Sequence, residues 1–271
     1  MLKQLTLAVT AAFCTAVMSA ETAPAVQTLP KQGYVTIASG DYTVTFMPKS
    51  NYRISGFAYQ NKELFISRGA PSGTNIVPAA AEKLISAKLT VDDQVPAKVT
   101  YAFVKGNKVV LEREALFGDV KLSVKYTLTP AGLTWSCKYK LETAAKKPSY
   151  FYLNTMTWSN KFDEYFFSSK SVKKSGKLTS SGGWVINSDA DCMAVYDSKR
   201  KVAAVTKFVT PIPGEMRKSS IWDHKAYHKY FLMHKRPDWK AGYESPEYVI
   251  AFSAVNAEPG EWQKKVEDSV K

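Results

Sequence analysis

The sequence predicts an all-β fold, a large two-sheet antiparallel β-sandwich (supersandwich) with a short C-terminal helix. Apolar and polar residues alternate with a period of two through much of the chain. The alternating stretches are short, and turn residues separate them at the spacing of hairpins. Almost no helical periodicity lies between them. A series of this kind is typical of strands that form two stacked antiparallel sheets.

The clearest element is a predicted hairpin at residues 121–141, with its turn at Pro130-Ala131-Gly132. The side expected to face inward is apolar and comprises Leu122, Val124, Tyr126, Leu128, Leu133, Trp135, Cys137, Tyr139 and Leu141. The side expected to face outward is polar and comprises Lys121, Ser123, Lys125, Thr127, Thr129, Thr134, Ser136, Lys138 and Lys140. We therefore expect Trp135 to lie in the core.

The same alternation predicts further strands along the whole chain. They are residues 42–47, 53–59, 88–91, 99–104, 109–115, 149–158, 183–186, 193–196, 202–208, 228–234 and 248–255. One helix is predicted near the C-terminus, with Pro259 in its first turn. Trp262, Val266 and Val270 recur every four residues as one stripe, so Trp262 is expected to fasten this helix to the sandwich.

The first twenty residues resemble a secretory signal peptide. Lys3 precedes an apolar stretch at residues 5–17, and the small pair Ser19-Ala20 follows it. We expect cleavage after Ala20, a flexible leader at residues 21–32 and a single β-sandwich domain at residues 33–271. The apolar stretch is too short for a transmembrane segment. A periplasmic or secreted location follows, whereas acylation of Cys14 is disfavoured because Phe13 precedes it.

Two cysteines, Cys137 and Cys192, remain after the expected cleavage. An exported protein can oxidise such a pair to a disulfide. The inward position of Cys137 fits two buried free thiols equally well. The sequence leaves both alternatives open.

Positive charge is in excess, since 37 Lys and Arg residues stand against 24 Asp and Glu residues and give a net charge of +13. Such an excess favours acidic partners, among them anionic polysaccharides and envelope surfaces. The lysines are scattered along the chain and form no sustained arginine-rich tract. Together with the predicted export, this argues against nucleic acid as a partner.

Three stretches carry motifs of a known superfamily, in the same order. The first runs from residue 42 to the turn Asn61-Lys62-Glu63-Leu64, the second is the hairpin at 122–141 with the strand after it, and the third is residues 239–252. They resemble the galactose-mutarotase-like, or aldose-epimerase-like, β-supersandwich superfamily. The resemblance implies a sandwich with one concave sheet, the surface on which relatives bind sugars.

The catalytic motifs of that superfamily are absent. Its mutarotases carry an N-H-x-Y-F segment on the strand after the hairpin, where this chain has residues 152–158 without a histidine. The family's earlier H-G motif is also missing, because the first histidine is His224, and no C-terminal motif matches its catalytic Glu. Opening a sugar hemiacetal requires a positioned acid and base. Ordinary aldose 1-epimerase activity is therefore not expected.

All three histidines lie close together, at His224, His228 and His234. On a strand at 228–234, His228, Tyr230 and His234 share one face, and they are the candidate catalytic residues. They could bind an acidic sugar or serve as the acid and base of a β-eliminating lyase. A solvated strand face without function is the plain alternative.

Six further residues are candidates for substrate binding. They are Arg217, Trp222, His224, Arg236, Arg68 and Asn75. No Asp or Glu with ligand spacing accompanies the histidines, so no metal site is expected. No phosphate loop or dinucleotide fingerprint is present, and no cofactor is expected.

These observations support three functions. The first is an exported carbohydrate-binding protein that engages a neutral or anionic glycan on its concave sheet. The second is a polysaccharide lyase or divergent epimerase that uses His228, Tyr230 and His234. The third is a non-catalytic envelope protein that binds a partner or has a structural role. The resemblance in fold does not choose among them, and the sequence leaves the oligomeric state open.

Overall fold

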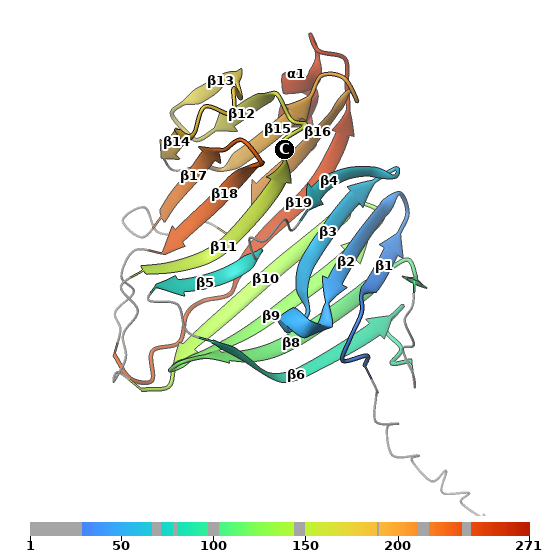
Figure 1. Cartoon of the computed structure of the whole chain (residues 1–271), viewed down its shortest axis with the longest axis vertical. Helices are drawn as coiled ribbons and strands as arrows, with labels where there is room; N and C mark the ends of the chain where they lie inside the picture. Colours follow the sequence, from blue (N-terminus) through green and yellow to red (C-terminus); the bar gives the residue numbers. More distant parts are fainter. Residues whose placement is uncertain are drawn as a thin grey trace, which may run out of the picture.

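A computed structural model describes residues 29–66, 72–77, 81–96, 103–143, 150–188, 190–210, 217–234 and 240–271 (Figure 1). The predicted signal peptide and most of the predicted leader lie outside these residues, as do Arg68 and Arg236. Within the described part, no helix is long and apolar enough to cross a membrane.

The described chain forms two sheets that face each other, which confirms the predicted all-β sandwich (Figure 1). The ten-stranded sheet runs in the order β14-β17-β18-β11-β4-β3-β2-β1-β7, with β5 also paired to β11. Its strands are β1 Val35–Ser39, β2 Tyr42–Met47, β3 Arg53–Tyr59, β4 Lys62–Ile66, β5 Gly73–Val77, β7 Phe103–Lys105, β11 Tyr150–Ser159, β14 Gly183–Ser188, β17 Arg217–Asp223 and β18 Tyr227–His234. Strand pairs in this sheet are antiparallel except β1 with β7.

The nine-stranded sheet runs in the order β13-β12-β15-β16-β19-β10-β9-β8-β6 and is antiparallel. Its strands are β6 Glu82–Val91, β8 Val109–Phe117, β9 Val120–Thr129, β10 Gly132–Leu141, β12 Glu164–Ser168, β13 Lys173–Lys177, β15 Cys192–Asp197, β16 Val202–Phe208 and β19 Tyr248–Asn256. Between the two sheets lies the main hydrophobic core, to which both contribute every second side chain.

The predicted hairpin is confirmed as β9 and β10, which pair from Gly132 with Thr129 to Leu141 with Val120. All the side chains expected to face inward are buried, and Trp135 is only 1% exposed. Gly132 has a φ of +130°, and a Cβ atom there would collide with the carbonyl oxygen of Phe252. The turn therefore depends on glycine at this position.

The predicted C-terminal helix is confirmed as α1, Trp262–Ser269. It begins at Trp262, so Pro259 lies in the turn before the helix and not in its first turn as predicted. The Trp262 indole stacks on the Tyr196 ring, with 4.9 Å between centroids, and its Nε1 donates to Glu164 Oε2 at 3.1 Å. Trp262 and Val266 close a second apolar cluster on the outer face of the nine-stranded sheet.

Several strands did not emerge from the sequence pattern, namely β1, β4, β5, β12, β13 and β17. Strand β13, with the sequence Lys-Lys-Ser-Gly-Lys, shows the reason. It is an edge strand and carries no apolar residue, so period-two alternation cannot reveal it.

Cys137 and Cys192 are both buried and free. Cys137 faces the core between the sheets, whereas Cys192 belongs to the cluster under α1. Their strands, β10 and β15, are separated by β19 and β16 in the sheet. The pair is thus two buried thiols, not a disulfide.

Candidate functional site

His228 lies in the interior of the sandwich. It has no exposed surface, its Nε2 donates to the Phe162 carbonyl at 2.8 Å, and its Nδ1 lies 2.8 Å from Asp223 Oδ1. Burial lowers the pKa of His228, while the Asp223 carboxylate and the Phe162 carbonyl act in the opposite direction. The expectation that His228 projects from a solvated face is wrong.

Asp223 gives this buried pair a structural role. Its Oδ2 accepts hydrogen bonds from the backbone nitrogens of Thr179 at 2.9 Å and Ser180 at 2.8 Å. In register, Asp223 lies opposite His228 across the β17–β18 hairpin. The pair thereby ties this hairpin to the segment that leads into β14.

The other two candidate catalytic residues, Tyr230 and His234, lie on β18. Arg217 of β17 pairs with His234 in register. For these three residues the structure describes the backbone, and their proposed roles remain predictions. Arg68 and Arg236 lie outside the described residues.

Trp222 and His224 lie near one corner of the ten-stranded sheet. Trp222 pairs with Trp184 of the edge strand β14, with ring centroids 4.8 Å apart at 76°, and Trp184 is 50% exposed. His224 lies in the turn between β17 and β18, where its ring stacks on Tyr227 and its Nδ1 accepts from the Ala226 nitrogen at 3.2 Å.

Asn75 lies on β5, with β11 and β18 between it and β17. Its Oδ1 accepts from Arg53 at 3.3 Å, and its Nδ2 donates to Thr155 Oγ1 at 2.9 Å and to the Gly73 carbonyl at 3.3 Å. Arg53 also donates to Glu82 at 2.7 Å. The Asn75 amide therefore holds strands together, and among the predicted binding residues with described side chains, Asn75 does not lie with Trp222 and His224.

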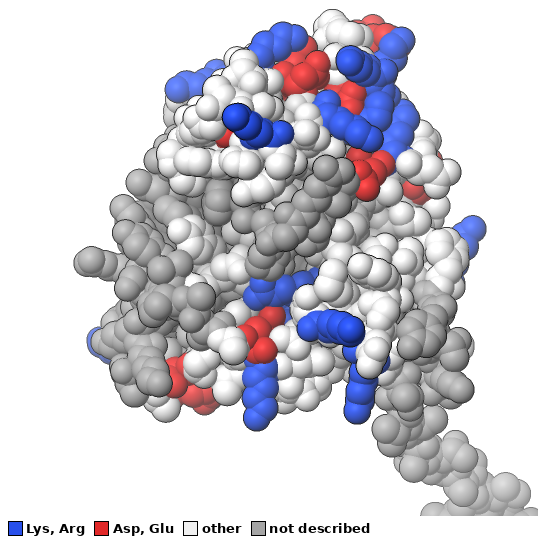
Figure 2. All heavy atoms as spheres, in the orientation of Figure 1, with Lys and Arg blue, Asp and Glu red and all other residues white. Residues whose placement is uncertain are grey.

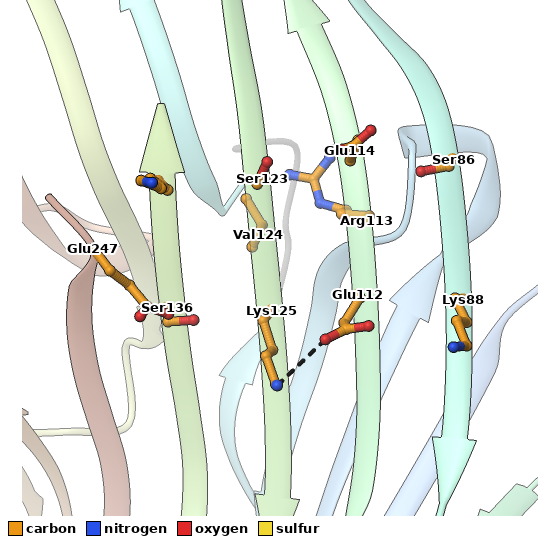
Figure 3. A pocket seen from close by; sticks show the side chains of 11 residues that line it. Ser86, Lys88, Glu112, Arg113, Glu114, Ser123, Val124, Lys125, Ser136 and Glu247 are labelled. Atoms are coloured by element: carbon orange, nitrogen blue, oxygen red, sulfur yellow. Dashed lines mark ion pairs between the residues drawn. The ribbon is translucent and has the colours of Figure 1, made fainter. Parts of the chain in front are cut away.

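A depression of about 490 Å³ lies on a different surface, the outer face of the nine-stranded sheet (Figure 3). We call it the trough. It is lined by Ser86 and Lys88 of β6, Glu112, Arg113 and Glu114 of β8, Ser123, Val124 and Lys125 of β9, Ser136 and Lys138 of β10, and Glu247 before β19. Arg113 and Val124 are buried and face the core, whereas the others, apart from Glu247, are outward positions of four adjacent strands.

Strand register arranges these side chains in two rows that cross the strands. One row is Lys88, Glu112, Lys125 and Ser136, and the other is Ser86, Glu114, Ser123 and Lys138. Within the described residues, the hydroxyls of Ser86, Ser123 and Ser136 bond to no other protein group. Three hydroxyls are thus available to a ligand.

The charged side chains of the trough are partly paired. Lys125 lies 3.3 Å from Glu112, as the dashed line in Figure 3 marks, and both are 48% exposed. Lys138 pairs with Glu244, beside the trough, and lowers the pKa of that carboxylate. Lys88 forms no ion pair with any described residue. Such exposed pairs are weak, so a ligand can exchange for them at low cost.

Basic and acidic side chains are also interspersed on the face drawn in Figure 2. The described Lys and Arg side chains are scattered over this face, and near α1 they lie beside Asp and Glu side chains. The net charge of +13 therefore does not gather into one basic patch among the described residues seen there.

The sequence pattern predicts an outward face of the 121–141 hairpin for Ser123, Lys125, Ser136 and Lys138, but it indicates no role for them. The signal that could have drawn attention to them is a pair of small hydroxyl residues among lysines on adjacent strands. Ser86 was missed because β6 begins at Glu82, six residues before the predicted strand.

No family model matches the chain, and no curated protein matches it. Among solved structures it is similar to a protein of Synechocystis, with a TM-score of 0.54 and 10% identity over 84% of this chain and 97% of the other. A galactose mutarotase-like protein from Lactobacillus casei gives a TM-score of 0.50 and 10% identity, with 82% and 100% covered. The α-N-acetylgalactosaminidase of Bifidobacterium bifidum gives 0.55 and 9% identity, with 86% of this chain matching 39% of that enzyme.

These similarities concern the fold. The chain is a large two-sheet β-sandwich, and it shares this fold with solved galactose mutarotase-like proteins. The fold implied by the three sequence motifs is thereby confirmed.

Proposed function

We propose that the chain is an exported carbohydrate-binding protein that holds a glycan in the trough. The observation that carries the proposal is a set of three serine hydroxyls that bond to no described protein group, flanked by Lys and Glu side chains, in a depression of about 490 Å³. A sugar ring presents hydroxyls that each donate and accept, and it needs directional partners of both kinds. The serines and charged groups provide both.

The fold supports the same proposal by analogy. One structural neighbour is named for its likeness to galactose mutarotase, and another is an α-N-acetylgalactosaminidase. Folds host many functions, so the trough and not the fold carries the proposal. The lyase alternative requires His228 to reach a substrate, and its complete burial does not favour that role.

The test is a glycan-array screen of residues 21–271, followed by calorimetry on the best ligand. Ser136→Trp fills the trough and should weaken binding about tenfold or more. Thr134→Trp is the matched control, because Thr134 is the next outward position on β10 and does not line the trough. Absence of any bound glycan, or equal affinity for Ser136→Trp and the wild type, would contradict the proposal.

The proposal of export rests on the first twenty residues. Mass spectrometry of the protein from its native host should find an N-terminus at Glu21. An intact Met1 on exported material would contradict this, and an acylated Cys14 would show a lipoprotein instead.

A further inference from the structure

We infer that the trough selects a net-neutral oligosaccharide over a polyanionic one, although the whole chain is strongly basic. This inference rests on the proposed function, since it names the ligand class of the same site. Within the trough the charges balance. Of the outward-facing groups, Lys88, Lys125 and Lys138 are cationic, and Glu112, Glu114 and Glu247 are carboxylates. The remaining charged residue of the lining, Arg113, is buried and pairs with Glu82. The net charge of +13 is therefore no guide to what this surface binds.

The arrangement of the charges strengthens this conclusion. In one row Glu112 lies between Lys88 and Lys125. In the other row Glu114 lies between Ser86 and Ser123, and it pairs with Lys121, beside the trough, at 3.3 Å. Adjacent strands are about 4.8 Å apart. A ligand carboxylate or sulfate placed against Lys88 or Lys125 therefore comes within about one strand spacing of Glu112, and like charges so close repel each other. One placed against Lys138 meets Glu244, with which that lysine is paired.

A neutral sugar is not repelled by these carboxylates. Its hydroxyls can donate to Glu112 and Glu114 and accept from Lys88 and Lys125, so both kinds of side chain contribute. The serines add groups that donate or accept as the ligand requires. A chain of charged sugars instead carries a charge on each ring and cannot avoid both carboxylates.

The extent of the trough indicates a short chain rather than one sugar. From β6 to β10 each row crosses three strand spacings, or about 14 Å. The volume of about 490 Å³ lies within the range of ligand sites. We therefore expect an oligosaccharide of a few rings that runs across the strands.

The test compares neutral with anionic oligosaccharides of similar length. Cellotriose, maltotriose and galactotriose form one set, and trigalacturonate, trimannuronate and a chondroitin sulfate tetrasaccharide form the other. The best neutral ligand should bind about tenfold or more tighter than the best anionic one at low salt. The difference should shrink as salt screens the repulsion.

Charge variants make the test specific. The double variant Glu112→Gln, Glu114→Gln removes both carboxylates and should improve binding of the anionic set several-fold, while Glu142→Gln, outside the trough, should not. If an anionic ligand binds the wild type best and Ser136→Trp abolishes that binding, the inference is overturned and the proposed function stands. If no ligand of either set binds, the proposed function falls as well.

Discussion

The outer face of the nine-stranded sheet has two halves. In both, inward and outward side chains alternate along each strand, but one half is covered and the other is exposed. Over β12, β15 and β16 the outward side chains are apolar, and α1 covers them. Over β6, β8, β9 and β10 they are Ser, Lys and Glu, and they form the open trough. Residue type at the outward positions, not backbone geometry, decides whether a sheet face becomes a second core or an exposed polar surface.

The covered half should respond most strongly to mutation. Trp262→Ala removes the indole that stacks on Tyr196, and it should lower the free energy of unfolding by about 3–5 kcal/mol, the usual range for an emptied aromatic core position. Lys264→Ala, an exposed position on the same helix, should change it by less than about 0.5 kcal/mol. Urea denaturation measures both. A loss below about 1 kcal/mol for Trp262→Ala would mean that α1 does not seal this half.

Thiol labelling sharpens the comparison, because one cysteine lies under α1 and the other faces the main core. Burial raises the pKa of both Cys137 and Cys192 to about 12, so neither thiol should be ionised at pH 8. A thiol reagent should label neither in the native protein and both after denaturation, as expected for free thiols. In Trp262→Ala, Cys192 should be labelled faster while Cys137 stays protected. Equal labelling rates for the two cysteines in Trp262→Ala would contradict the separation of the two clusters.

Substitution in the open half should have the smallest effect on the free energy of unfolding. Lys125→Ala breaks an ion pair between two half-exposed side chains and should cost less than about 1 kcal/mol. Thermal denaturation at low and high salt would check this. A larger loss would show that the trough is part of the stabilising framework and not a free surface.

The fold was predictable to the extent that alternation revealed it. Trp135 and the β9–β10 hairpin follow directly from period two, since both strands bury one side. Strand β13 does not, because an edge strand of lysine, serine and glycine has no apolar side to show.

The site was harder to predict for a physical reason. His228, Tyr230 and His234 lie on one strand, so the pattern could group them, but it could not show that the His228 position faces the core. The pattern also could not reveal that Asp223 pairs with His228 across the hairpin. The trough combines β6 with β8, β9 and β10 through strand register, and no local pattern contains that register.

The most direct test of the proposed trough site is a crystal structure of residues 21–271 with the best glycan from the array. We expect an oligosaccharide in the trough, with its hydroxyls within hydrogen-bonding distance of Ser123 and Ser136. The oligosaccharide should run across β8, β9 and β10. A sugar bound instead on the outer face of the ten-stranded sheet, near Asn75 or Trp222, would contradict it.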